Sequence, residues 1–141
     1  MLRPDGTPAR DGIIPEIDLP GHTLAILAAY PELACFPCEF EVETRWGIFD
    51  DILCVGKPET IDFLRELLDE LCELFPGKYF HIGGDEAPKT RWKECELCTA
   101  MLDKHELSDY EALQGWFTNE MVKILREKGK EVLAWDEVLD S

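Results

Sequence analysis

The sequence predicts an α/β fold with parallel strands, and three observations support this class. Three short apolar runs are separated by two longer segments whose apolar residues recur at helical spacing. That alternation of strand and helix is typical of parallel β/α units. Each apolar run is followed by acids, an aromatic residue or a histidine, and in such folds the carboxyl ends of the strands carry binding and catalytic groups. Because 141 residues can bury one modest core, we expect a single domain.

The first predicted strand occupies residues 12–18. It follows residues 1–11, which are polar, contain proline and glycine, and are expected to form a loop at the boundary of the chain. The strand leads into a turn that presents His22. Residues 22–30 are apolar and rich in alanine, which predicts a brief helix closed by Pro31.

A long irregular segment follows, over residues 31–57. It contains three cysteines, Trp46, and the acids Asp50 and Asp51. A loop of that length in a compact domain is usually functional or disordered. Its aromatic residues favour packing, so we expect an ordered excursion over the strand ends.

Residues 58–75 form the clearest predicted helix. Pro58 suits its first turn, Glu59 complements its dipole, and Pro76-Gly77 ends it. Apolar residues at helical spacing are interpreted as a core face packed on the sheet. They are Ile61, Leu64, Leu67, Leu68, Leu71, Leu74 and Phe75.

The second predicted strand, residues 78–80, breaks into the loop His-Ile-Gly-Gly-Asp-Glu at 81–86. The two glycines allow backbone or ligand to approach closely. Asp85 and Glu86 point to opposite faces of an extended backbone, so they cannot duplicate each other. Two acids this close resist ionising together, which suits a general acid beside a charged partner. The alternative is a helix N-terminus at which both acids complement the dipole before Pro88.

The second long helix is expected to begin after Ser108 or Asp109 and to run to about Lys128, where Gly129 provides a stop signal. Before it, residues 90–104 are expected to form a short helix or turn segment. The apolar side of the long helix consists of Leu113, Trp116, Phe117, Met121, Ile124 and Leu125.

The chain is strongly acidic, with a formal net charge of −16. Nucleic acid and anionic membranes require a basic surface, so neither is expected as a partner, whereas a neutral sugar is compatible with this charge. No run approaches the roughly 18 apolar residues of a membrane span, and residues 1–11 lack the apolar core of a signal peptide. The compartment is not predicted.

The six cysteines leave three alternatives open. They form the pairs Cys35-x-x-Cys38 and Cys95-x-x-Cys98, together with two single cysteines at positions 54 and 72. They can be buried or free thiols, they can form disulfides, or the two pairs can meet in a four-thiolate metal site. The cysteine at position 72 lies in the predicted helix over 58–75 and is expected to be a small core residue.

Three motifs together resemble glycoside hydrolase family 20, the β-N-acetylhexosaminidases. They are residues 14–22, residues 81–86 and residues 134–137, where the third predicted strand, 131–135, ends in Trp-Asp-Glu. The resemblance implies a (β/α)8 TIM barrel, which usually needs roughly 250 residues. We therefore expect 12–141 to be a fragment of the catalytic barrel, with about three parallel strands and their connecting helices. Its unpaired strand edges could permit self-association.

The resemblance also implies roles for four residues in the hydrolysis of N-acetylhexosamine-containing glycans. Glu86 would be the general acid and then the base, and Asp85 would hold the acetamide and stabilise the charged intermediate. His22 would lie behind Glu86, and Trp135 would form a wall of the acetamido pocket. The 2-acetamido oxygen of the sugar would be the nucleophile, a variant that is preferred because adjacent acids are poorly placed to flank a scissile bond. Neither a cofactor nor a catalytic metal is implied.

Other interpretations remain for these residues. His22 could cap the following helix, and Trp135 could be ordinary core. His81, Asp18 and Glu137 are expected to order the loops without a direct role. Further contacts that this family uses, including an arginine, have no counterpart in the chain, so we expect the chain alone to be inactive. A non-catalytic carbohydrate-binding fragment and a zinc-stabilised structural domain are the competing functions.

Overall fold

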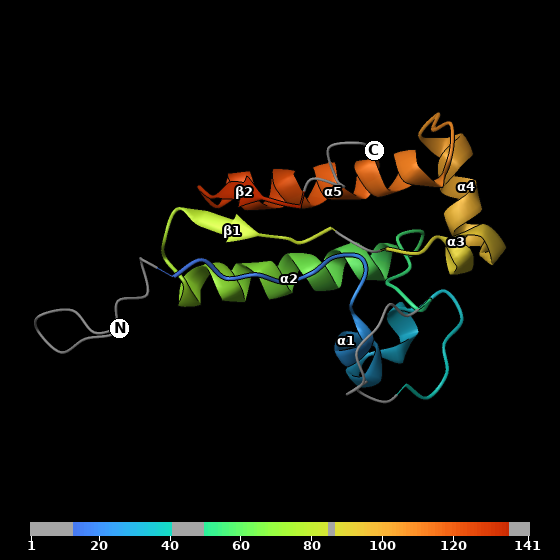
Figure 1. The fold of residues 1–141 in the computed structure, drawn as a ribbon, viewed down its shortest axis with the longest axis horizontal. Coiled ribbons are helices and arrows are strands. Elements are labelled where there is room, and N and C mark those ends of the chain that lie inside the picture. The colour runs from blue at the N-terminus through green and yellow to red at the C-terminus, as the bar shows by residue number, and fades with distance from the viewer. Residues whose placement is uncertain (1–12, 41–49, 85–86, 136–141) are drawn as a thin grey trace, which may run out of the picture.

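The computed structural model describes residues 13–40, 50–84 and 87–135. The predicted loop over residues 1–11 lies outside these ranges. Figure 1 shows two long helices, α2 and α5, beside the strands, with shorter helices gathered at one end. The elements in chain order are α1 (Leu24–Ala29), the 3-10 helix η2 (Pro31–Leu33), α2 (Pro58–Leu74), β1 (Tyr79–His81), α3 (Thr90–Glu94), α4 (Glu96–Lys104), α5 (Tyr110–Glu127) and β2 (Glu131–Leu133).

The strands are parallel, as the sequence predicts. β1 pairs with β2 with Phe80 opposite Val132. The first predicted strand lies on the other side of β1, where the amide of Ile17 donates to the carbonyl of His81 at 3.0 Å. This contact is only a parallel bridge between Glu16 and His81, so the first stretch is shorter than the strand predicted over 12–18.

The two faces of this sheet differ in burial. Phe80 and Ile82 point to one face and are fully buried in the core. The register places Glu16, His81 and Leu133 in one row on the opposite face, where Leu133 is 38% exposed. Parallel sheets are normally covered on both faces. Among the described residues, this sheet is covered on one face and open on the other.

The long helices supply the covering layer. On α2, Leu64 and Leu68 are completely buried, which confirms the predicted core face. The helical spacing predicts that Leu74 shares that face, but half of it is exposed. It follows Leu67 by seven residues, at the edge of the apolar stripe, where packing ends. The fully buried residues of α5 include Leu113, Phe117, Met121, Ile124 and Leu125.

Both ends of α5 are formed by the predicted signals. The carboxylate of Asp109 accepts a hydrogen bond from the amide of Ala112 at 2.8 Å, which satisfies one donor of the first turn. At the other end Gly129 has a φ of 79°. Its amide and that of Lys130 donate to the carbonyls of Arg126 and Leu125, a Schellman pattern that only a residue tolerating positive φ completes easily.

The buried ammonium group of Lys130 joins the two halves of the fold. It donates to the carbonyls of Phe75 and Gly77, at the end of α2, at 2.8 and 2.5 Å. The contact with Phe75, the C-cap residue of α2, satisfies a carbonyl that the helix end leaves without a partner. It also fixes the start of β2 beside the start of β1. None of the helices within the described ranges is both long and apolar enough to cross a bilayer.

Candidate active site at the carboxyl ends of the strands

The turn after the first strand places His22 in front of α1. His22 has a φ of 54°, and its side chain is exposed. The next residue, Thr23, occupies the N-cap position of α1, and its hydroxyl donates to the carbonyl of Pro20 at 3.0 Å. The interpretation of His22 as a helix cap is therefore wrong. His22 instead lies in the turn that follows the stretch paired with β1.

The turn after β1 requires glycine. Gly83 and Gly84 both have positive φ, 68° and 94°, a region that side chains make unfavourable. A Cβ atom on Gly83 would lie 2.9 Å from the Cα of Asp18 and would collide with its carboxylate. The predicted close approach is thus confirmed at Gly83, where Asp18, at the end of the first strand, lies against the glycine.

Trp135 lies against the same turn. Its amide donates to the carbonyl of Gly83 at 2.9 Å, and its ring contacts the imidazole of His81 with 4.9 Å between centroids. The side chain is 48% exposed, so within the described residues Trp135 is not part of the buried core. Nδ1 of His81 accepts the amide of Gly83 at 2.9 Å, which agrees with the loop-ordering role expected for this histidine.

Asp85 and Glu86 lie outside the described residues, but both flanks of this acidic pair are held by α5. On one side, the amide group of Gln114 donates to the carbonyl of Gly84 at 2.8 Å. On the other side, the ammonium group of Lys89 donates to the carbonyl of Ala87 at 2.6 Å and to Oε1 of Gln114 at 2.5 Å. The buried side-chain amide of Gln114 therefore connects the two sides of residues 84–87, a segment called the acidic loop below.

Sequence reasoning missed Gln114 and Lys89. Gln114 is 4% exposed and follows Leu113 on the buried side of α5. A glutamine inside an apolar stripe is the available signal, because a buried amide must find hydrogen-bond partners. Its partners could not be identified from spacing, since they lie 30 and 25 residues away in the chain. The predicted acids at 136 and 137 lie outside the described part.

Four cysteine sulfurs gather at this end of the fold. They belong to Cys35, Cys54, Cys95 and Cys98, and all lie within 4.8 Å of one another. Cys38 is exposed, and its sulfur lies 3.7 Å from the carbonyl oxygen of the neighbouring Glu39. The predicted grouping of two CxxC pairs is wrong, because Cys54 takes the place of Cys38.

The six cysteines are free thiols in the structure, so the disulfide alternative is not observed. Within the cluster, hydrogen bonds from Cys35 and Cys98 lower the pKa of Cys54 to about 3. The contact with Cys54 raises the pKa of Cys35 far above its usual value. Cys72, on α2, is only partly buried, so it is less enclosed than the predicted core position.

Comparison with known proteins gives consistent matches. The model of the glycosyl hydrolase family 20 catalytic domain matches residues 11–141. The chain is 48% identical over 128 residues to a beta-hexosaminidase of Porphyromonas gingivalis, covering 91% of the chain and 16% of that protein. It is 36% identical over 126 residues to a beta-hexosaminidase of Akkermansia muciniphila, covering 89% of the chain and 26% of that protein.

Solved structures match as well. A chitobiase of Flavobacterium johnsoniae superposes with a TM-score of 0.84 at 42% identity, over 89% of this chain and 19% of that one. A beta-N-acetylhexosaminidase of Bacteroides fragilis gives a TM-score of 0.82 at 41% identity, over 91% and 24%. The chain thus spans between 16% and 26% of the length of these four proteins.

Proposed function

The chain belongs to glycosyl hydrolase family 20, and from this premise we propose that it supplies part of the catalytic domain of a β-N-acetylhexosaminidase. The observation that carries the proposal is the family match, which includes all three strand-end motifs. The substrates would be glycans that contain N-acetylhexosamine. The names of the matched relatives support this class, since they are beta-hexosaminidases and a chitobiase.

We propose that residues 12–141 form part of a (β/α)8 barrel. Alternate residues of barrel strands point inward and are covered by side chains from the other strands. The open row of Glu16, His81 and Leu133 suits such an interior face, because the chain itself leaves it uncovered in the described part. A barrel usually needs roughly 250 residues, so about three strands with their helices would come from here.

The proposed reaction is substrate-assisted and retains the anomeric configuration. Glu86 would protonate the departing glycosidic oxygen while the acetamido oxygen of the sugar attacks the anomeric carbon. The C–O bond to the leaving group breaks, and the new C–O bond closes an oxazolinium ring. Asp85 would accept the acetamide N–H and balance the positive charge. Water, deprotonated by Glu86, would then open the ring.

Three features of the structure support these roles. Trp135 presents an exposed aromatic face next to the turn that precedes the acids, as a wall for an acetamido methyl group would require. His22 lies at the end of the adjacent strand. Gln114 holds the Gly84 end of the acidic loop, which limits displacement of catalytic groups, and even small displacements are costly.

The test is hydrolysis of chromogenic N-acetylglucosaminide and N-acetylgalactosaminide by the complete catalytic domain that carries these residues. Loss of the general acid in Glu86→Gln should reduce kcat by roughly 10²- to 10⁴-fold. The matched control is Glu94→Gln on the exposed side of α3, which should keep the parent rate. Saturable sugar binding without hydrolysis by the parent domain would instead identify a carbohydrate-binding fragment. The isolated chain is expected to be inactive.

A further inference from the structure

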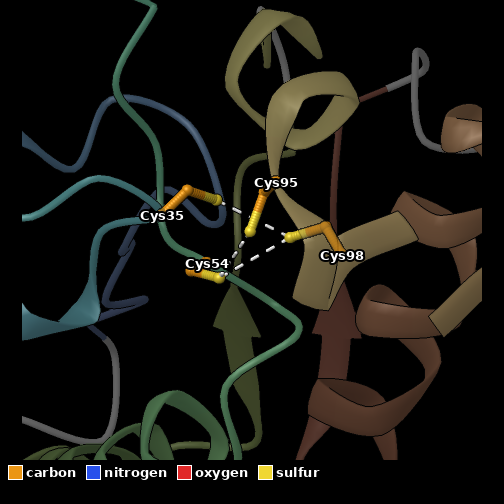
Figure 2. Close-up of side chains that lie close together, drawn as sticks. All are labelled: Cys35, Cys54, Cys95 and Cys98. Atoms are coloured by element: carbon orange, nitrogen blue, oxygen red, sulfur yellow. Dashed lines mark hydrogen bonds between the residues drawn. The ribbon is translucent and has the colours of Figure 1, made fainter. Parts of the chain in front are cut away.

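The thiol cluster has the dimensions of a metal site. Figure 2 shows the side chains of Cys35, Cys54, Cys95 and Cys98 converging from separate segments. The sulfur of Cys98 lies 3.6 Å from those of Cys35 and Cys54, and the sulfur of Cys54 lies 3.8 Å from that of Cys95. A tetrahedral zinc site with bonds of about 2.3 Å separates its sulfurs by about 3.8 Å. A disulfide would need about 2.05 Å.

The segment that carries Cys54 is fixed by neighbours on both sides. On one side, its amide donates to the carbonyl of Leu33 at 2.8 Å, and Leu53 forms an antiparallel bridge with Ala34. On the other side, the indole of Trp92 donates to the carbonyl of Leu53 at 3.0 Å. None of these contacts involves a sulfur atom. The backbone therefore holds Cys54 in place without help from the other three cysteine side chains.

The helices α3 and α4 present the remaining pair. Cys95 is the extended residue at which α3 ends and α4 begins, and Cys98 lies in the first turn of α4. This break explains why the predicted segment over 90–104 is two helices. Gly56 packs so closely on α4 that a Cβ atom would lie 2.5 Å from the carbonyl carbon of Leu97.

The ligand set identifies the class of metal. Four thiolates in a tetrahedral arrangement select zinc or iron over calcium and magnesium, which prefer oxygen ligands. Sulfurs within 4.8 Å of one another leave room for a single ion. Cys54 and Cys98 are fully buried and Cys95 is 5% exposed. A closed set of four protein ligands is typical of structural zinc, because a catalytic zinc keeps a position open for water.

We propose that Cys35, Cys54, Cys95 and Cys98 bind one structural zinc ion. Cys35 and Cys54 belong to the excursion that follows the first strand and His22, whereas Cys95 and Cys98 belong to the segment that follows β1 and the acidic loop. The ion therefore joins two consecutive strand-end excursions. Binding releases the thiol protons and forms four zinc–sulfur bonds. This inference does not depend on the proposed glycosidase activity.

The test is metal content, measured by plasma mass spectrometry on protein purified without added metal or chelator. The expected result is one zinc per chain in the unsubstituted protein and a zinc content at least tenfold lower in Cys54→Ser. Cys38→Ser and Cys72→Ser are matched controls that should retain the zinc. Equal loss in Cys38→Ser and Cys54→Ser would overturn the ligand assignment, and iron in place of zinc would overturn the choice of metal.

Two readouts on the unsubstituted protein keep the test decisive if Cys54→Ser does not fold. Cobalt that replaces the metal should give intense thiolate-to-metal charge-transfer bands and the visible bands of a tetrahedral site. Under native conditions without chelator, the thiols outside the cluster, Cys38 and Cys72, should react first with a thiol reagent, and the four cluster thiols should react rapidly only once a chelator is added. Absence of cobalt binding, or a disulfide within the cluster in non-reducing peptide mapping, would overturn the proposal.

Discussion

The thiol cluster and the Gly83–Gly84 turn lie at the same end of the strands but are held together in different ways. The turn is held by the backbone hydrogen bond from Trp135 to Gly83, by the imidazole of His81 and by the side-chain amide of Gln114. In the cluster, sulfurs from three separate stretches of the chain meet within 4.8 Å. The shape of the turn also follows from the positive φ of its own two glycines, whereas the cluster depends only on how distant segments pack.

The two regions therefore differ in how much tertiary packing they require. A positive-φ turn is favoured by its own glycines before any packing occurs. Thiols brought together from segments up to 63 residues apart have no such local preference, and the entropy of ordering them must be offset by packing or by a metal. Substitutions that damage one region should therefore leave the other largely intact.

Gly83→Ala should produce the largest effect and should act on the turn. The new Cβ atom would collide with Asp18, and an alanine is also unfavourable at the positive φ of this position. Together these effects should lower the free energy of unfolding by roughly 3 to 5 kcal/mol. Urea unfolding measures it. Gly129→Ala is the control: its φ is also positive, but no atom lies within 4 Å of the Cβ position, so about 1 kcal/mol is expected. Equal losses in both variants would contradict the role of Asp18.

Gly56→Ala tests the cluster in the same way. φ is not in the positive region at Gly56, so the cost comes only from the collision with the backbone of Leu97 and Cys98, about 2 kcal/mol. Because this pushes α4 away from Cys54, the zinc affinity should also fall, which a competition titration with a chromophoric chelator measures. An unchanged zinc affinity would show that Gly56 does not set the spacing of the sulfurs.

Gln114→Leu should have a smaller effect, confined to the acidic loop. It leaves the carbonyl of Gly84 without this donor and removes one acceptor of Lys89, which should cost about 1.5 kcal/mol of stability. In the complete domain kcat should fall more than KM changes, while zinc content stays the same. Asn119→Leu, on the exposed side of the same helix, should change none of these values. A loss of zinc in Gln114→Leu would show that the two regions are coupled.

The smallest change in stability is expected when the ion pair between α2 and α5 is removed. Arg65 and Glu127 lie 3.3 Å apart, but their side chains are 51% and 66% exposed. Pairs this exposed contribute between 0 and about 1 kcal/mol, because water and salt screen them. Arg65→Ala should therefore change the urea midpoint only slightly and should affect neither region. A larger loss would mean that the aliphatic part of the side chain contributes to packing.

Much of the fold could be predicted because its signals are local. Proline at the start of α2, the carboxylate of Asp109 and the stop at Gly129 each act within one helical turn, and all occur at the predicted positions. The close approach at Gly83 was also predictable, since two glycines directly after a strand leave the backbone free of side chains. The exposure of Leu74 was not predictable, because helical spacing does not show how wide the packed face is.

The candidate site was predictable only in part, and the reason lies in the range of its interactions. The sequence by itself determined the order of strands and helices, the glycine turn, and the positions of His22 and Trp135 at strand ends, because apolar periodicity and turn residues act over a few positions. Only the tertiary structure decided that Cys54, and not Cys38, completes the cluster, and that Gln114 holds the acidic loop. Those contacts join segments that meet only after the helices have packed, and no spacing within the chain encodes that distance.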